Sequence, residues 1–468
     1  MISKITVKQI CYIFFFLGLF FIPFNSFEGL DFLGEFKSES AAYFFLLGFL
    51  FLLLSQKIVI PIYNFYFRLV LMFLLWCSIS TLINYSNLQV SYFKHTYGFS
   101  RFYRQFLSLI LSTLIFLVFY YNVFINFKRM EILIDVRRVF LISLIFVFIV
   151  GIVDILVVIF NISSFRVFFE LLDYFPFFKK SYFTERITSV SAEPPFLAIY
   201  LITISGWMLS YINTNKGFIK YLPAIFIFIL TYYSGSRTAL IVISIQYLLY
   251  IFLTIPFYVI LKKTRKFVIL FSLLFSIFFL FNAEKIFKSV ETKVDSLNFV
   301  ENLKTNVSNQ SRFGMQYASL VVFSENPIVG VGFGQQGYES RYNYPGWAVK
   351  NNWEFVNYYK NSNVPAFPPG YNIYTRLLAE TGIIGFLTFI LLIVLSIRKA
   401  KIIMNNNEGE TKVLAIILLI SLTGLYINWL QIDTFRIYGV WISLALLMRI
   451  EKNRKNESQS DSVVNTTL

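Results

Sequence analysis

Residues 223–253 read "PAIFIFILTYYSGSRTALIVISIQYLLYIFL", which is two apolar runs on either side of a short polar turn. Each run approaches the length of about 20 residues that an α-helix needs to cross the hydrocarbon core of a bilayer. A helix satisfies its backbone hydrogen bonds internally, so it can cross lipid without exposing unpaired polar groups. The stretch therefore predicts two antiparallel transmembrane helices, with Arg237 in the turn between them.

The composition of the whole chain extends this prediction. Hydrophobic residues make up 57% of the 468 residues and charged residues only 14%, which is typical of a protein embedded in lipid. We predict an all-α polytopic integral membrane protein with about twelve transmembrane helices. The predicted spans lie near 9–24, 40–56, 67–84, 106–126, 139–160, 194–212, 218–234, 238–260, 267–282, 382–397, 413–431 and 434–448.

The charged segments between the spans predict the orientation of the chain. "KKTRK" (262–266) and "RIEKNRK" (449–455) are basic, as is typical of cytoplasmic segments, whereas the loop at 25–40 is acidic. Both termini are therefore expected in the cytoplasm. The predicted organisation is nine transmembrane helices in 1–282, a large external loop in 283–371, three transmembrane helices in 372–448 and a disordered cytoplasmic tail in 449–468.

The turn "SGSR" (234–237) has the features of an anion site. Ser234 and Ser236 precede a long helix and are candidate caps, and the first turn of a helix offers unpaired N–H groups and a positive dipole end. The guanidinium of Arg237 can hold phosphate oxygens through two parallel hydrogen bonds. The alternative is an arginine that reaches lipid headgroups at the membrane boundary.

Three further stretches favour the anion site over an arginine that only reaches lipid headgroups. "ERITSVSAEPPFLAIYL" (185–201) contains Arg186 and Glu193, and "SRFGMQYASLVVFSENPIVGVGFG" (311–334) begins near Arg312. "PPGYNIYTRLLAETGIIGFLTFIL" (368–391) leads into the tenth predicted span. At these residues the chain resembles the O-antigen ligase and O-antigen polymerase superfamily of inner-membrane glycosyltransferases, over roughly 185–395.

The signature of that superfamily after the large external loop differs here at its first position. The family pattern is His, then Asn, Ser or Gln, then two spaced glycines; here Tyr371 and Asn372 are followed by Gly382 and Gly385 at the family spacing. In the ligase branch the His serves the acceptor, and a phenol with an ordinary pKa of about 10 is a poor general base. The polymerase branch is therefore favoured. Tyr371 and Asn372 could alternatively form only a turn before the helix, with an interfacial aromatic ring.

The resemblance implies a glycosyltransferase that uses a polyprenyl-diphosphate-linked oligosaccharide at the outer face of a bacterial inner membrane. The product would be a surface polysaccharide, either O-antigen of lipopolysaccharide or capsule. We expect Arg186 and Arg237 to hold the diphosphate and Glu193 to act as general base. The expected substrate contacts are Arg312, Tyr371, Asn372 and Glu380. Glu193 and Glu380 could instead be interfacial or pairing acids.

Other functions and partners are restricted by the sequence. One histidine and two cysteines argue against a metal site, and we expect neither metal nor other cofactor. Membrane lipid is an expected partner and a chain-length regulator protein a further candidate, whereas nucleic acid is excluded. A ligase that transfers glycan to lipid A core or protein is the first alternative. A repeat-unit flippase is the alternative of another class, although no repeat relates 1–230 to 231–468.

Overall fold

A computed structural model of the protein describes residues 7–55, 58–183, 185–254 and 306–465. These residues are mostly helical, and their only strands are the short antiparallel pair β1 (Tyr92–Phe93) and β2 (Thr96–Tyr97). The long helices are α1 (Val7–Phe20), α2 (Ser40–Ser55), α3 (Phe65–Ile83), α5 (Gly98–Ile110), α6 (Phe116–Ile125), α8 (Arg137–Asp154), α10 (Pro194–Thr214), α11 (Leu222–Tyr233), α12 (Arg237–Thr254), α15 (Val307–Glu325), α18 (Ile373–Asn405), α19 (Gly409–Asn428) and α20 (Tyr438–Asn465).

Shorter helical segments connect or extend these helices. The short α-helices are α4 (Tyr85–Val90), α7 (Arg129–Glu131), α9 (Arg166–Leu172), α16 (Gln336–Ser340) and α17 (Gly346–Val349). The 3-10 and π segments are η1 (Asp31–Phe36), η2 (Leu111–Ile115), η3 (Ile132–Val136), η4 (Ile155–Ile159), η5 (Ser163–Phe165), η6 (Phe218–Tyr221) and η7 (Phe355–Tyr359). Because η2, η3 and η4 continue neighbouring α-helices, several spans are longer than one α-helix.

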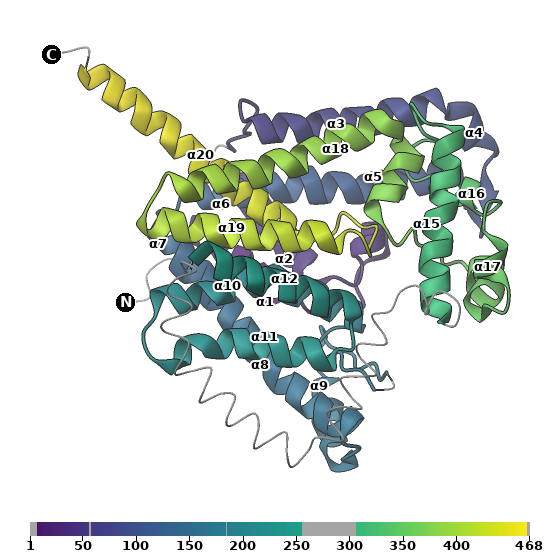
Figure 1. The fold of residues 1–468 in the computed structure, drawn as a ribbon, viewed down its shortest axis with the longest axis horizontal. Helices are drawn as coiled ribbons and strands as arrows, with labels where there is room; N and C mark the ends of the chain where they lie inside the picture. The colour runs from purple at the N-terminus through teal and green to yellow at the C-terminus, as the bar shows by residue number, and fades with distance from the viewer. Residues whose placement is uncertain (1–6, 56–57, 184, 255–305, 466–468) are drawn as a thin grey trace.

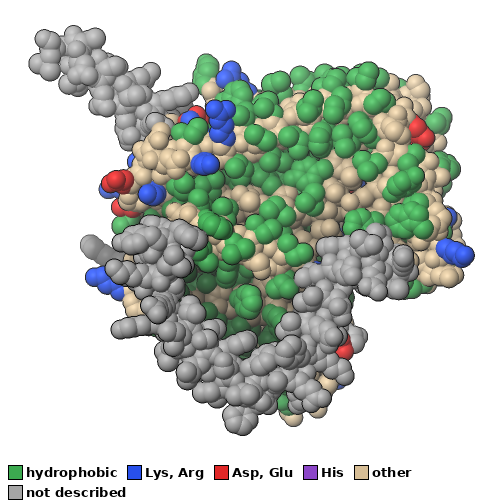
Figure 2. Space-filling model, in the orientation of Figure 1, with side chains coloured by type: hydrophobic (Ala, Val, Ile, Leu, Met, Phe, Trp, Pro, Cys, Tyr) green, Lys and Arg blue, Asp and Glu red, His purple; other side chains and the backbone are tan. Residues whose placement is uncertain are grey.

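The fold is an all-α polytopic membrane protein, as predicted. Helices occupy every predicted span except 267–282, which lies outside the described residues. Seven described segments are long and apolar enough to cross a membrane, namely Phe65–Ile83, Gly98–Ile125, Arg129–Ile159, Pro194–Thr214, Arg237–Thr254, Ile373–Asn405 and Gly409–Asn428. Hydrophobic side chains spread over the flank of the helical bundle in Figure 2, and charged side chains gather toward its two ends.

Buried polar contacts fix the helices that lead to the site. Gln246 of α12 is fully buried, and its side-chain amide donates to Ile202 O of α10 (3.1 Å) and Ile420 O of α19 (3.0 Å). A buried amide left without partners would be costly, so these bonds favour one arrangement of the three helices. The position of α12 in turn determines where Arg237, its first residue, lies.

One end of the bundle bears additional structure. The helices α15, α16 and α17 lie beyond the ends of the long helices, and α1 begins and α20 ends toward the opposite end (Figure 1). The helices α15, α16 and α17 belong to the expected external loop 283–371. Residues 283–305 of that loop lie outside the described residues. The structure describes α20 as far as Asn465, within the predicted tail 449–468, whose disorder stays a prediction. That segment is rich in Lys, Arg and Glu, which have good helix propensity.

Candidate functional site

A cavity of about 560 Å³ lies where the additional helices meet the bundle. Its walls come from the start of α10, the turn between α11 and α12, the start of α15, the segment before α18 and the turn between α19 and α20. Of the residues predicted for the site, the cavity wall contains Arg186, Glu193, Arg237, Arg312 and Tyr371. Segments remote in sequence therefore contribute to one polar space.

Arg186 is fixed beside the turn between α11 and α12. Its backbone neighbour Ile187 donates to Tyr233 O (3.2 Å), and the Arg186 Nε donates to Ser234 O (3.2 Å). Gly235, with φ +63°, lies directly against the arginine side chain. A larger residue would meet that side chain, which explains the glycine within "SGSR".

The loop that contains Arg186 is anchored by a buried ion pair. Asp154 accepts from Lys180 Nζ at 2.5 Å, and the two side chains are 0% and 2% exposed. The same carboxylate oxygen accepts from the backbone N–H groups of Thr188 (2.9 Å) and Ser189 (3.0 Å). These contacts hold the two residues that follow Arg186 and Ile187, so they determine the path of the loop into the cavity.

Arg237 begins α12. The hydroxyl of Ser236 accepts from Ala239 N (3.3 Å), so the predicted cap is confirmed for this serine. The Arg237 Nη2 donates to the side-chain oxygen of Asn309 (2.8 Å), which lies in α15. This bond joins the turn in the bundle to the helix that contains Arg312.

Arg312 spans the cavity wall between α15 and the turn before α20. It donates to the backbone and side-chain oxygens of Gln431 (3.3 and 3.4 Å) and its guanidinium lies 4.7 Å from the ring centre of Tyr371. Burial lowers the pKa of Arg186, and the charges of Arg312 and Arg237 lower it further. Within the described residues, neither Arg186 nor Arg312 forms an ion pair with a carboxylate. The cavity is thus an electropositive site suited to an anion with several oxygens.

Glu193 is the acidic residue nearest this cluster among those predicted. It precedes α10, whose first residue is Pro194, and its side chain makes no capping bond. The carboxylate is exposed, lines the cavity and opposes the lowering of the Arg186 pKa. It is therefore available to a group bound in the cavity.

Tyr371 lines the cavity, but Asn372 does not belong to its lining. Tyr371 has φ +57°, and its hydroxyl lies 2.6 Å from that of Tyr359. Asn372 caps α18 by accepting from Tyr374 N (2.9 Å) and Thr375 N (3.3 Å). Its side-chain nitrogen donates to Gln316 Oε1 (3.2 Å), so both polar ends of the Asn372 side chain have protein partners, and its contact with substrate stays a prediction.

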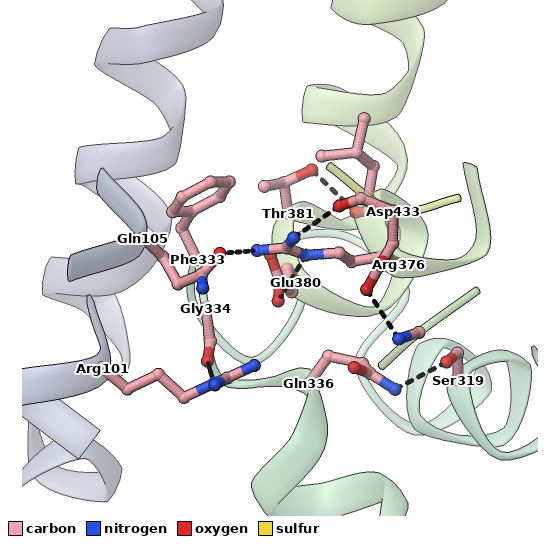
Figure 3. A network of polar contacts seen from close by, with 12 residues as sticks. Arg101, Gln105, Ser319, Phe333, Gly334, Gln336, Arg376, Glu380, Thr381 and Asp433 are labelled. Carbon is pink, nitrogen blue, oxygen red and sulfur yellow. Dashed lines mark hydrogen bonds and ion pairs between the residues drawn. The ribbon is translucent and has the colours of Figure 1, made fainter. Parts of the chain in front are cut away.

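Glu380 lies outside the cavity lining, in the buried network of Figure 3. It pairs with Arg376 (3.1 Å), and both side chains are nearly inaccessible. Arg376 also donates to the Gln105 side chain (2.8 Å) and to Asp433 O (2.7 Å). The pairing alternative stated for Glu380 therefore agrees with its surroundings, and the network fixes the Asp433 turn against α18.

Residues 222–390 match a family model described as O-antigen ligase. This part of the chain is therefore similar to the O-antigen ligase family. This match confirms the resemblance to the O-antigen ligase and polymerase superfamily. The match supports a function of the O-antigen ligase or polymerase type in polysaccharide assembly, and together with the apolar helices it indicates a multi-pass inner-membrane protein. Among curated proteins, none matches the chain.

The family domain includes Arg237, Arg312 and Tyr371 but ends before the turn between α19 and α20. It begins after Arg186 and Glu193. The cavity is therefore completed by segments on both sides of the matched region. Among the described residues, no group of three His, Cys, Asp or Glu side chains could hold a metal ion.

The glycine signature of the domain serves the backbone. Gly382 has φ +61° and bends α18, and a Cβ there would lie 2.2 Å from Ile328 O. Carbonyl groups near the bend accept from Val331 N and Gly332 N (2.9 Å each) and from Trp76 Nε1 (2.8 Å). The spacing thus sets where the helix bends, and the Gly-rich turn after α15 satisfies the backbone groups there.

Several cavity residues were not predicted. Asn309 holds Arg237, Gln431 holds Arg312, and Asp433 and Arg436 line the wall nearby. A signal for three of them was present, because "QIDTFR" (431–436) places an amide, an acid and an arginine around the junction of the last two predicted spans. Asn309 had no such signal.

Proposed function

We propose that this protein is a polymerase of surface polysaccharide, O-antigen or capsule. In this reaction a glycan linked to a polyprenyl diphosphate moves onto another lipid-linked repeat unit at the outer face of the inner membrane. The observation that carries the proposal is the meeting of Arg186, Arg237 and Arg312 in one cavity, to which the region matched by the O-antigen ligase family model contributes Arg237 and Arg312.

The arginines would stabilise the departing diphosphate. A hydroxyl of the acceptor sugar attacks the anomeric carbon of the donor sugar, and the bond from that carbon to the diphosphate oxygen breaks. Negative charge grows on the diphosphate as the bond breaks, so fixed guanidinium groups favour the transition state over the ground state. Arg186 and Arg237 are assigned to the diphosphate and Arg312 to an adjacent anionic or sugar group.

A base must take the proton of the attacking hydroxyl. Glu193, the general base expected from the sequence, lines the cavity, and so does Tyr371, which was expected only as a substrate contact. Tyr371 stands where the ligase branch has His, which favours polymerisation over ligation. Transfer to lipid A core or protein is the second candidate function, because the matched family model is described as O-antigen ligase.

Reconstitution can separate the two functions. The purified protein in lipid vesicles would receive a polyprenyl-diphosphate-linked repeat unit, with or without lipid A core. Polymer that remains lipid-linked, and forms without lipid A core, is the expected result. Product that forms only when lipid A core is added would favour the ligase. Arg186→Ala, at matched protein abundance, is the control that links the product to the cavity.

A further inference from the structure

A chain of hydrogen bonds leads from the cavity wall into the cap formed by α15–α17 and η7. The hydroxyl of Tyr371 lies 2.6 Å from that of Tyr359, and the Tyr359 hydroxyl donates to Glu354 Oε2 at 3.2 Å. Tyr371 lines the cavity, whereas Glu354 is only partly buried. The three groups thus connect the proposed reaction site to a carboxylate near the outer surface.

The direction of these hydrogen bonds follows from the carboxylate. An ionised Glu354 can only accept, so the single proton of Tyr359 points toward it. Tyr371 must then donate its proton to Tyr359. The remaining lone pairs of the Tyr371 oxygen can accept a proton, which is the polarity that an attacking sugar hydroxyl requires.

Neighbouring contacts hold the chain in place. Asn352 is fully buried, accepts from Glu354 N (3.0 Å) and donates to Ser311 of α15 (3.0 Å). On the cavity side, Arg312 stacks on the ring of Tyr371. The helix that contributes Arg312 to the cavity therefore also supports the segment with Glu354. The fold thus fixes the distances between the hydroxyl groups of Tyr371 and Tyr359 and the carboxylate of Glu354.

A tyrosine that acted alone would be a weak base here. Burial raises the pKa of the Tyr371 phenol, although the charge of Arg312 opposes the rise. Burial also raises the pKa of Tyr359. Neither phenolate would accumulate, so a proton can enter Tyr371 only if another leaves at the same time.

We propose that Tyr371, Tyr359 and Glu354 form a proton relay that removes the proton of the acceptor sugar hydroxyl. This inference rests on the proposed transfer reaction and names the route of its proton. The hydroxyl gives its proton to Tyr371 Oη as its oxygen bonds to the anomeric carbon. Tyr371 passes its own proton to Tyr359, and Tyr359 passes its proton to Glu354. The electron pair of the broken bond leaves with the diphosphate, and Glu354 later releases the proton to water.

Tyr359→Phe tests the relay most directly, because it keeps the ring and removes the central hydroxyl. We expect kcat in the reconstituted reaction to fall about a hundredfold, which is a typical rate enhancement from general acid–base catalysis. The apparent KM for the lipid-linked unit should change little, since Tyr359 does not line the cavity. In the wild-type protein, the solvent deuterium isotope effect on kcat should indicate that several protons move in one step. Tyr359→Phe should lose this multi-proton isotope effect.

Matched variants separate the relay from a structural effect. Tyr358→Phe is the control, because Tyr358 lies in the same segment, is half-exposed and makes no hydroxyl hydrogen bond within the described residues. Glu354→Gln is the second test, since the amide can accept from Tyr359 but cannot take its proton. It should lower kcat with folding intact, and it keeps the proposal testable if Tyr359→Phe fails to fold.

Two other carboxylates provide competing outcomes. Asp433 lines the cavity and accepts from Gly370 N (2.6 Å), and Glu193 lines it beside Arg186. Wild-type kcat and isotope effect in both Tyr359→Phe and Glu354→Gln would overturn the relay. If Asp433→Asn or Glu193→Gln alone then abolished turnover, that acid would be the base. A wild-type protein that transfers no glycan in vesicles would instead refute the proposed function.

Discussion

The side chain of Arg186 lies against Gly235, so closely that a Cβ on this glycine would come within 2.9 Å of the arginine Cγ. Gly235 also has φ +63°, a conformation that costs other residues about 1–2 kcal/mol. The turn between α11 and α12 therefore needs glycine for two reasons, and only the steric one concerns the cavity.

Gly235→Ala should displace Arg186 and lower glycan formation at least about tenfold, which corresponds to a change of about 1.4 kcal/mol in the barrier. Gly217→Ala is the matched control, because Gly217 has φ +76° but no atom within 4 Å of an added Cβ. It should show the backbone strain without the loss of product. Equal losses in the two variants, compared at matched membrane abundance, would assign the effect to strain alone.

Arg237→Ala should lower transfer about a hundredfold, because loss of one preorganised donor costs about 3 kcal/mol in the barrier. Arg237→Lys should fall between, since an ammonium keeps the charge but loses the planar grip on phosphate. The measurement is polymer formed in cells at matched membrane abundance. Near-normal chains from both variants would make Arg237 a boundary residue that contacts lipid headgroups.

The sequence predicted the helices well because lipid allows few alternatives. Apolar runs of spanning length must become helices, so the run at 238–260 contains α12, whose described residues end at Thr254. The resemblance then named Arg186, Arg237 and Arg312, which lie far apart in the chain and meet in one cavity. Their role in transfer stays a prediction.

The partners of buried groups could not be predicted in the same way. Glu380 was expected to bind substrate, yet it pairs with Arg376, one helical turn earlier in α18. A pair at that spacing is visible in sequence, but its burial depends on Gln105 and the Asp433 turn, which tertiary packing supplies. The link from Tyr371 through Tyr359 to Glu354 was also hidden, because it depends on how the cap folds.

Excess chelator should leave transfer unchanged in purified lipid vesicles. If the arginines neutralise the diphosphate as proposed, the leaving group is stabilised without a divalent ion. The assay compares initial rates with and without chelator at constant ionic strength. Loss of activity that a divalent ion restores would require a metal-assisted mechanism in place of this one.

A cysteine at Ser362 should react with an impermeant thiol reagent from outside the inner membrane. Ser362 is exposed within the predicted external loop, whereas both natural cysteines are buried. Whole cells with a permeabilised outer layer would be labelled before and after lysis of the inner membrane. Labelling that occurs only after lysis would reverse the predicted orientation, and the protein without the added cysteine measures background.

Asp154→Asn should destabilise the protein more than removal of the whole ion pair. The variant leaves the charge of Lys180 buried at 2% exposure, and breaking such a pair by removal of one partner costs about 3–5 kcal/mol. The double variant Asp154→Asn/Lys180→Met removes both charges and should recover much of that stability. Midpoints of thermal inactivation in detergent give the comparison. Additive effects of the two substitutions on that midpoint would mean that the pair does not act as a unit.

Because Asp154 also holds Thr188 and Ser189, the single variant should lower transfer by loosening the loop that places Arg186.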